Sequence, residues 1–397
     1  MHDLIVVGGG PSGTTCARVA RQRGLRVLLI TSGPTYERDL RLQVPVSRPA
    51  LSLMGEQARE TTRHLVSEVV VHPPGDGPVS CHRREPLLLA DYTHLTEMLL
   101  TEAVDAGVEL VRRQEVLAVE QLKRGIRVLA RGESYQGHLL VGADGVSSVV
   151  ASCVGARDSW AQSQLIGVRA QQVSAQPATF GGVNAQDESR TSILGLFPQV
   201  SNGCHGWTIQ SAGRSVRGVF STTCGKETLC NCWDSFVKRI RSERSVQNGQ
   251  GGLRDFTLPC CTSGTRVVAR RAMLVGSAGA FGSPLTGEDL FYAVSSGRIA
   301  AEVAADAADT RDPLYVRVYQ DRVNSELVPQ QVTTVRLYNE LFGSTDSIRR
   351  LCDAARGSHT MSQQLGEVFA GTETGDKSLR TLRGMLHIAR TTRDESA

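Results

Sequence analysis

The chain has 397 residues, of which 21% are charged, and its formal net charge is +4. This length allows two or three domains whose cores need no disulfide bonds, and the balanced charge disfavours nucleic acid or an acidic membrane as the main partner. No apolar run reaches the ~18 residues that span a bilayer, and no basic leader precedes the first strand, so we expect a cytoplasmic protein without an integral membrane segment.

The first elements of the chain predict a βαβ unit. Residues 4–7 (LIVV) and 25–30 (LRVLLI) suit short strands buried on both faces, and residues 12–23 have the apolar spacing of a helix. The first strand runs directly into GGGPSG, and the helix begins inside that stretch. A strand, a glycine turn and a helix in this order are typical of a dinucleotide-binding fold.

The turn contains G-x-G-x-x-G as Gly8, Gly10 and Gly13. Gly8 permits the tight turn, Gly10 lets the backbone approach a pyrophosphate, and Gly13 allows close packing of the helix on the strand. Pro11 and Ser12 begin the helix, whose first N–H groups and positive dipole end would face the diphosphate. Three glycines alone are compatible with a purely structural turn, but this setting favours a cofactor site.

The second strand ends at Thr31. In dinucleotide-binding folds an acidic residue stands about twenty positions after the glycines and binds the ribose hydroxyls. A threonine hydroxyl can bond a ribose, but without the assistance of a charge. The sequence departs from the usual anchor at this position.

The next elements alternate between strands and a helix. Residues 61–89 suit two strands joined by a Pro/Gly turn, and residues 92–106 suit an amphipathic helix. Residues 138–143 suit another buried strand, which ends in a turn at Asp144 and Gly145. The end of this strand is a second candidate for the cofactor edge, by which we mean the edge of the parallel sheet where a cofactor would bind.

A change in amino-acid composition and apolar pattern predicts a second domain. From about residue 162 to residue 262 the chain has short β-like runs rich in Ser, Gly, Thr and Gln. The buried-strand pattern then returns at residues 272–279 (AMLVGSAG), with Ser277 at its end, where such loops usually carry a carboxylate. Pro284 and Gly287 follow in a turn before a long helix, and the chain beyond residue 312 reads as helical.

These nucleotide-type elements lie on both sides of the β-rich segment. A cofactor site therefore requires that Gly10, Asp144 and Ser277 meet at the carboxyl edge of one parallel sheet, where open α/β sheets collect ligands. Separations above ~20 Å would be incompatible with one bound dinucleotide.

Three stretches together resemble the flavoprotein superfamily of geranylgeranyl reductases, whose relatives include tryptophan halogenases and aromatic hydroxylase-type monooxygenases. They are residues 8–13, GADG at residues 142–145, and VGSAGAFGSPLTGEDLFYAVSSGRIAAE at residues 275–302. The resemblance covers residues 1–155 and 267–308. It fades in the middle of the chain, where only LGLFPQ around Phe197 is similar to the substrate-domain signature of the reductases.

The resemblance implies an α/β fold with a doubly wound, Rossmann-like FAD-binding domain, a mixed β-sheet substrate domain and a helical C-terminal part. The expected FAD-binding domain comprises residues 1–60, 90–160 and 265–312, the substrate domain 61–89 and 161–264, and the helical part 313–397.

The resemblance also implies cofactor contacts. Asp144 and Gly145 would support the FAD pyrophosphate region, and Pro284 and Gly287 would bring a helix N-terminus near the flavin pyrimidine ring. Ser277 stands where the family has an aspartate that holds a ribityl hydroxyl.

After Thr31 and Ser277, a third difference from the family pattern follows the predicted hairpin. The next helix begins Asp91-Tyr92, where the family often has Asp-Arg. If two carboxylates are replaced by hydroxyls, as at Thr31 and Ser277, the loss is ~1–4 kcal/mol, or about one to three decades of affinity. We therefore expect weak or exchangeable FAD.

The function implied is that of an FAD-dependent reductase or monooxygenase acting on an apolar or polycyclic small molecule in specialised metabolism. The chain has only one G-x-G-x-x-G, so electrons would come from transiently bound NAD(P)H or from a separate reductase. Phe197, Trp207 and Tyr292 are the candidate substrate contacts.

Two other functions stay open. If the flavin has been lost, the cavity could hold a flexible chain for cyclisation, with Asp289 or Glu288 as a general acid. Asp289 stands where the family usually has glycine, whereas Glu288 matches a common glutamate of the loop; both acids also suit the N-terminus of a helix for its dipole alone. A non-catalytic small-molecule binding protein is the third reading.

Six cysteines crowd the second half of the chain near His205, but their spacing fits no structural zinc pattern, so we expect reduced thiols and no metal site. The six are Cys204, Cys224, Cys230, Cys232, Cys260 and Cys261.

The basic segment at residues 377–393 has its apolar residues only partly in helical register. We expect a packed or frayed terminal helix rather than a peripheral membrane contact.

Overall fold

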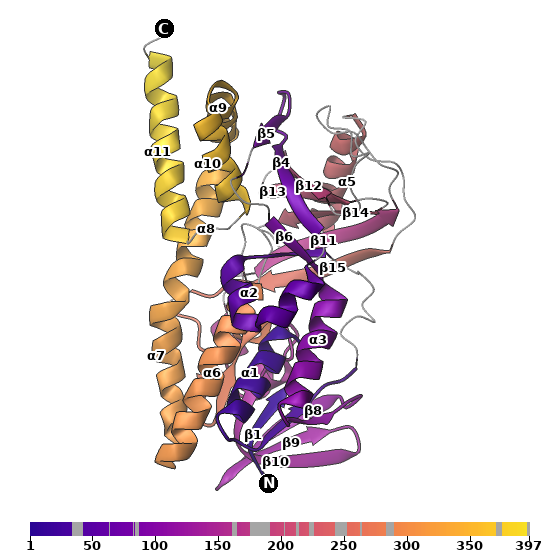
Figure 1. Cartoon of the computed structure of the whole chain (residues 1–397), viewed down its shortest axis with the longest axis vertical. Coiled ribbons are helices and arrows are strands. Elements are labelled where there is room, and N and C mark those ends of the chain that lie inside the picture. Colours follow the sequence, from indigo (N-terminus) through magenta and orange to yellow (C-terminus); the bar gives the residue numbers. More distant parts are fainter. Residues whose placement is uncertain are drawn as a thin grey trace.

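The protein is described here by a computed structural model. It describes residues 1–33, 43–62, 64–81, 83, 87–160, 165–174, 191–201, 203–211, 214–221, 226–242, 252–262, 264–282, 290–370 and 375–394. One sheet forms the lower part of the molecule and the other the upper part, and a column of helices runs beside both of them (Figure 1). This arrangement confirms the predicted α/β class.

The first sheet has a parallel core in the order β17-β10-β1-β2-β7, extended by the antiparallel strands β16, β9 and β8. Its strands are β1 (His2–Val7), β2 (Val27–Ile30), β7 (Glu109–Val111), β8 (Val116–Leu122), β9 (Gly125–Ala130), β10 (Glu133–Gly142), β16 (Val268–Ala269) and β17 (Ala272–Leu274). The apolar runs predicted as buried strands are fully enclosed, as Leu4, Ile5 and Leu28 show.

Helices cover this sheet as a doubly wound fold requires. They are α1 (Pro11–Gln22), α3 (Tyr92–Asp105), the short α4 (Val149–Cys153) and α6 (Leu290–Thr310). α1 and α6 pack closely because Gly297 has no side chain: a Cβ there would lie 2.3 Å from the Ser12 carbonyl oxygen. Short 3-10 helices occupy Arg157–Ser159, Gly276–Gly279 and Pro313–Val316.

The second sheet lies above the first and is mainly antiparallel, in the order β15-β11-β14-β13-β12-β4-β6-β3, with β5 on β4. Its strands are β3 (Gln43–Val46), β4 (His64–Val71), β5 (Val79–Cys81), β6 (Leu87–Asp91), β11 (Leu165–Ser174), β12 (Thr191–Ser201), β13 (Cys204–Ser211), β14 (Arg214–Ser221) and β15 (Leu253–Pro259). The β4–β5 pair is the hairpin predicted within residues 61–89.

The second sheet begins earlier in the chain than expected. β3 falls within residues 1–60, which were predicted to belong to the first domain, but it pairs with β6 at the edge of the second sheet. Between β3 and β4 lie α2 (Arg48–Met54) and the 3-10 helix Glu56–Thr61. An edge strand tolerates Pro45, since one side of it needs no ladder hydrogen bond.

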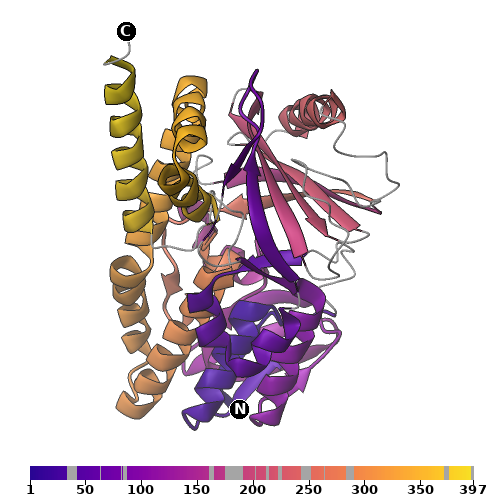
Figure 2. The same ribbon diagram turned by 45° about the horizontal axis from the view of Figure 1, so that its top comes forward.

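The β-rich segment also contains a helix that the sequence analysis missed, α5 (Lys226–Ser242). It covers the face of the second sheet that points away from the helical column (Figure 2). Its apolar residues Leu229, Trp233, Phe236 and Ile240 follow the helical spacing of three or four, so the signal was present. We call this face of the sheet the outer face.

The C-terminal region is helical, as predicted. It comprises α7 (Arg317–Glu326), α8 (Val328–Phe342), α9 (Thr345–Gly357), α10 (His359–Ala370) and α11 (Gly375–Asp394). α8 runs beside the inner face of the second sheet, the face opposite α5, and α11 packs Leu379, Leu382 and Met385 into the same core. Among the described helices, none is long and apolar enough to cross a membrane.

Candidate functional site

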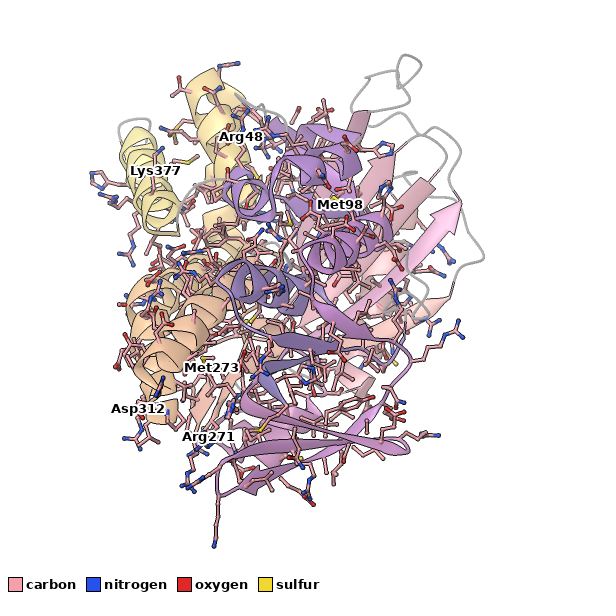
Figure 3. All side chains as sticks on the ribbon, turned by 60° about the horizontal axis from the view of Figure 1, so that its bottom comes forward. Arg48, Met98, Arg271, Met273, Asp312 and Lys377 are labelled. Atoms are coloured by element: carbon pink, nitrogen blue, oxygen red, sulfur yellow. The ribbon has the colours of Figure 1, made fainter. Side chains whose placement is uncertain are left out.

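The strand ends predicted to form the site meet at one edge of the first sheet. In the register, Val7 lies beside both Ile30 and Gly142, and Gly142 lies beside Leu274. The glycine turn and the segments holding Thr31, Asp144 and Ser277 therefore leave the sheet side by side. Figure 3 labels Arg271, directly before β17, and Asp312, past the end of α6, at the opposite end of this domain.

The glycine turn has the geometry that each glycine requires. Gly8 has φ +113°, and a Cβ there would lie 2.1 Å from the Ala143 carbonyl oxygen. A Cβ on Gly13 would lie 2.0 Å from the Gly8 carbonyl oxygen, whereas a Cβ on Gly10 would meet nothing within 4 Å. The first two glycines are thus demanded by the protein itself, and Gly10 borders open space.

The N-terminus of α1 faces the same space. Gly10 is its N-cap, no side chain caps the helix, and Pro11 begins it. The Thr14 hydroxyl donates to the Gly10 carbonyl oxygen at 2.9 Å, which holds the turn in place. A helix end with uncapped N–H groups beside a close-approach glycine suits a phosphate group.

Asp144 holds the neighbouring turn rather than projecting into this space. Its carboxylate accepts from the Ser148 hydroxyl at 2.5 Å and from the Val150 N–H at 3.1 Å, and so caps α4. Burial raises the pKa of this carboxyl, against the effect of those hydrogen bonds. The following Gly145 has φ +79° and also borders open space. We infer that Asp144 positions backbone at the edge.

Thr31 is buried beneath the glycine turn. Its hydroxyl donates to the Gly33 carbonyl oxygen at 3.2 Å, and a Cβ on Gly9 would lie 3.0 Å from that hydroxyl oxygen. Thr31 therefore supports the turn, in addition to any bond to a ribose.

Ser277 is half-buried in the 3-10 helix that follows β17. The N–H of Gly276 donates to the Ser296 hydroxyl oxygen at 3.0 Å, and the Tyr319 hydroxyl donates to the Leu274 carbonyl oxygen at 2.8 Å. These contacts hold the strand end against α6 and α7. The sequence analysis missed Ser296 and Tyr319; a serine within the mostly apolar α6 was a signal for the first, whereas Tyr319 lies in the mostly polar α7.

The loop after this strand is described only at its start. Pro284, Gly287, Glu288 and Asp289 lie outside the described residues. Gly282, the last described residue before them, is clamped: a Cβ there would lie 2.5 Å from the Pro259 carbonyl oxygen of β15. On the other side the Gln331 amide of α8 donates to the Gly282 carbonyl oxygen at 3.0 Å.

Asp91 serves α3 rather than the cofactor edge. Its carboxylate accepts from the His94 N–H at 3.0 Å as the N-cap of α3, which starts at Tyr92 as predicted.

The three candidate substrate residues do not form one site. Phe197 has no exposed surface and lies on the outer face, stacked on His72 with ring centroids 4.2 Å apart and edge-on to Phe236 of α5 at 5.3 Å. Its assignment as a substrate contact is therefore not supported by its position. Successive residues of a strand point to opposite faces, and the pairing of Leu196 with Trp207 puts Trp207 on the inner face.

Tyr292 lies in the first turn of α6, 7% exposed within the core of the first domain. It sits beside the end of the undescribed loop. The cysteines give no metal centre among the described residues, where no three His, Cys, Asp or Glu side chains converge.

The described residues fit the diphosphate of a dinucleotide. Open space lies above Gly10 and Gly145, the uncapped end of α1 points to it, and Ser277 stands at the adjoining strand end. The inner face of the second sheet rises above this edge (Figure 1) and is apolar, with Leu194, Leu196, Phe220 and Leu258. The arrangement can hold a dinucleotide under an apolar layer.

Comparison with known proteins agrees with this geometry. The FAD binding domain family matches residues 1–217. A digeranylgeranylglycerophospholipid reductase from Methanothrix thermoacetophila is 25% identical over 405 aligned residues, which cover 97% of this chain and 95% of the relative.

Solved structures share the fold. A geranylgeranyl bacteriochlorophyll reductase-like protein from Thermoplasma acidophilum has a TM-score of 0.75 at 19% identity, with 97% of this chain and 99% of that chain covered. A mutant of halogenase PltM in complex with FAD has a TM-score of 0.67 at 12% identity, with 100% and 92% covered. The chain belongs to the FAD binding domain family, and digeranylgeranylglycerophospholipid reductases are among its sequence relatives.

Proposed function

We propose that this protein is an FAD-dependent reductase or monooxygenase that acts on an apolar or polycyclic small molecule. The observation that carries the proposal is the open space above Gly10 at the uncapped end of α1, directly below an apolar sheet face. When bound, FAD would supply the redox chemistry, and the protein would supply orientation and exclusion of water.

The residues of the chain have distinct parts in this proposal. The backbone at Gly10 and the start of α1 would bind the diphosphate, and Ser277 would hydrogen-bond the ribityl chain. Asp144 and Thr31 act on backbone, through the α4 cap and the Gly33 carbonyl. The inner face of the second sheet would bind the substrate and keep water away from the reacting atoms.

The relatives narrow the substrate class only by analogy. One relative is named as a digeranylgeranylglycerophospholipid reductase, and the halogenase is a second chemistry on the same fold. An apolar lipid chain agrees with the apolar inner face of the second sheet. The electron donor in this proposal is transiently bound NAD(P)H or a separate reductase, because the chain has one dinucleotide motif.

The test is titration of the purified protein with FAD, followed by flavin fluorescence and the visible spectrum. We expect saturable quenching in the micromolar range, and reduction of a substrate or of oxygen only when FAD is present. Turnover by protein stripped of flavin would contradict the proposal and point to the cofactor-free cyclase. A colourless protein that quenches no flavin fluorescence would contradict it too.

Ser277→Asp should tighten FAD binding. A charge-assisted hydrogen bond contributes ~1.5–3 kcal/mol against ~1 kcal/mol for a neutral one, which predicts a dissociation constant about 2- to 30-fold lower. Ser277→Ala is the matched control and should weaken binding about fivefold. A Ser277→Asp protein that binds FAD no better than Ser277→Ala would show that this side chain does not face the cofactor.

A further inference from the structure

Three buried polar atoms of β13 and α8 have no hydrogen-bond partner among the described residues. They are Nε2 of His205, Nε1 of Trp207 and Oε1 of Gln331. Buried polar atoms are nearly always paired, since an unpaired donor or acceptor loses its bonds to water. Three such atoms in one layer therefore need an explanation beyond packing.

The three side chains belong to one stripe of α8 and to the strand against which that helix packs. Gln331, Val335, Tyr338 and Phe342 recur at helical spacing and form one stripe of α8. His205 Nδ1 lies 3.0 Å from the Tyr338 hydroxyl, and Trp207 and Val335 pack against the same apolar cluster. Gln331 stands at the lower end of the stripe, where its amide contacts Gly282 beside the cofactor edge.

His205 is closed off by aromatic rings. It is 2% exposed, stacked on Phe342 at 4.4 Å and 5.0 Å from Phe220. With Tyr338 on its other nitrogen, this histidine belongs to the packing of α8 on the sheet, and it is not part of the site proposed below.

Trp207 differs because its side chain is not fully buried. It is only half-buried although the helical column covers its face of the sheet. Neighbours on this inner face keep some exposure, such as Leu196 at 8% and Leu258 at 6%, whereas Phe197 and Phe236 on the outer face have none. The indole lies across Gly218, where a Cβ would be 2.8 Å from Nε1, so its plane is fixed by the backbone beneath it.

We propose that Trp207 and Gln331 are specificity-determining residues that recognise a polar group on the substrate. The indole N–H donates to a substrate oxygen, and the Gln331 carboxamide oxygen accepts from a hydroxyl or N–H. The chemical class that fits is an oxygenated ring system, such as a phenol, rather than a plain hydrocarbon chain. This inference rests on the proposed function, because it concerns the substrate of that same site.

The contacts of Gln331 determine where the polar group of the substrate would lie relative to the cofactor edge. Its Nε2 donates to the Gly282 carbonyl oxygen, at the start of the loop next to the cofactor edge, so its Oε1 is held at a fixed place relative to that loop. A substrate bound to both residues is positioned against the cofactor edge and cannot slide along the apolar face. A site that hydrogen-bonds a substrate rejects the analogue lacking the polar group, because the protein atoms are then left unpaired.

The experiment compares 2-naphthol with naphthalene by equilibrium dialysis against the FAD-saturated protein. We expect 2-naphthol to bind at least tenfold more tightly, which corresponds to 1.4 kcal/mol. Trp207→Phe keeps an aromatic ring and removes the N–H, and Gln331→Met keeps the length and removes the amide. Either variant should lower the preference about fivefold or more and leave the affinity for naphthalene unchanged.

Trp233→Phe is the matched control, since Trp233 belongs to α5, which packs on the outer face, and the change should leave both affinities unchanged. Equal affinity of the wild-type protein for the two probes, or no measurable affinity for 2-naphthol, overturns the inference. So does an unchanged preference in both inner-face variants. FAD titration of the same preparations tests the proposed function separately, because a failure there appears as lost flavin binding whatever the probes do.

Discussion

Gly10→Ala should fold normally and lose FAD, and Gly13→Ala should fail to fold well at all. The two glycines belong to one motif, but their surroundings are opposite. A Cβ at position 13 would lie 2.0 Å from the Gly8 carbonyl oxygen and 3.0 Å from the Ala143 side chain, whereas one at position 10 meets nothing within 4 Å. Backbone cannot yield as a flexible side chain does, so we expect Gly13→Ala to cost about 3 kcal/mol or more.

Gly10 has φ −75° and ψ 177°, an extended conformation that alanine adopts without strain. Its replacement by alanine should change the free energy of unfolding by no more than about 1 kcal/mol, because the lower entropy of the unfolded chain opposes the poorer N-cap preference of alanine. The added methyl would occupy the space where a diphosphate must approach the backbone, so we expect the FAD dissociation constant to rise at least about tenfold. Chemical denaturation and flavin titration of both variants provide the measurement.

A Gly10→Ala protein that binds FAD like the wild type would show that the open space at α1 is not the diphosphate site. Loss of folding in that variant would also contradict this geometry, because it would mean that a Cβ at position 10 clashes with the protein. Gly13→Ala tests the packing alone, because no ligand is needed for its clash.

The cofactor edge could be predicted from sequence because its parts are local. Each of the three strand ends carries its own signal, a buried apolar run followed by small residues, and parallel strands must bring those ends to one edge. The carboxylate of Asp144 was harder to place. This carboxylate accepts hydrogen bonds from Ser148 and Val150. Those bonds depend on the geometry of the turn after β10, which the Asp-Gly pair alone does not define.

The residues of the inner face of the second sheet were less predictable, because their placement depends on side-chain alternation and on packing against distant helices. Phe197 and Trp207 are both aromatic and close in sequence, but they occupy opposite faces of the second sheet. Their separation depends on the register of β12 with β13, in which Leu196 rather than Phe197 pairs with Trp207. α5 then packs against one face and α8 against the other, and neither contact has a signal within the strands themselves.

Stability should fall below about pH 6.5 because of His205. Burial lowers the pKa of this side chain to about 3, whereas an unfolded histidine has a pKa near 6.5. The unfolded chain therefore takes up a proton below about pH 6.5, while the folded protein does not until about pH 3. The stabilising contribution is present above the unfolded pKa and is lost as the pH falls, by about 2 kcal/mol between pH 7 and pH 5.

The double variant His205→Phe/Tyr338→Phe should remove this part of the pH dependence, because it removes both partners of the 3.0 Å contact and leaves no buried group unpaired. Tyr338→Phe alone keeps the histidine and should keep the slope. The measurement is urea denaturation at pH 5, 6 and 7, with each variant compared with the wild type so that titration of other groups cancels. If the double variant and the wild type lose stability equally over this range, His205 does not remain neutral in the folded protein, and the aromatic enclosure by Phe342 and Phe220 does not exclude water as the structure indicates.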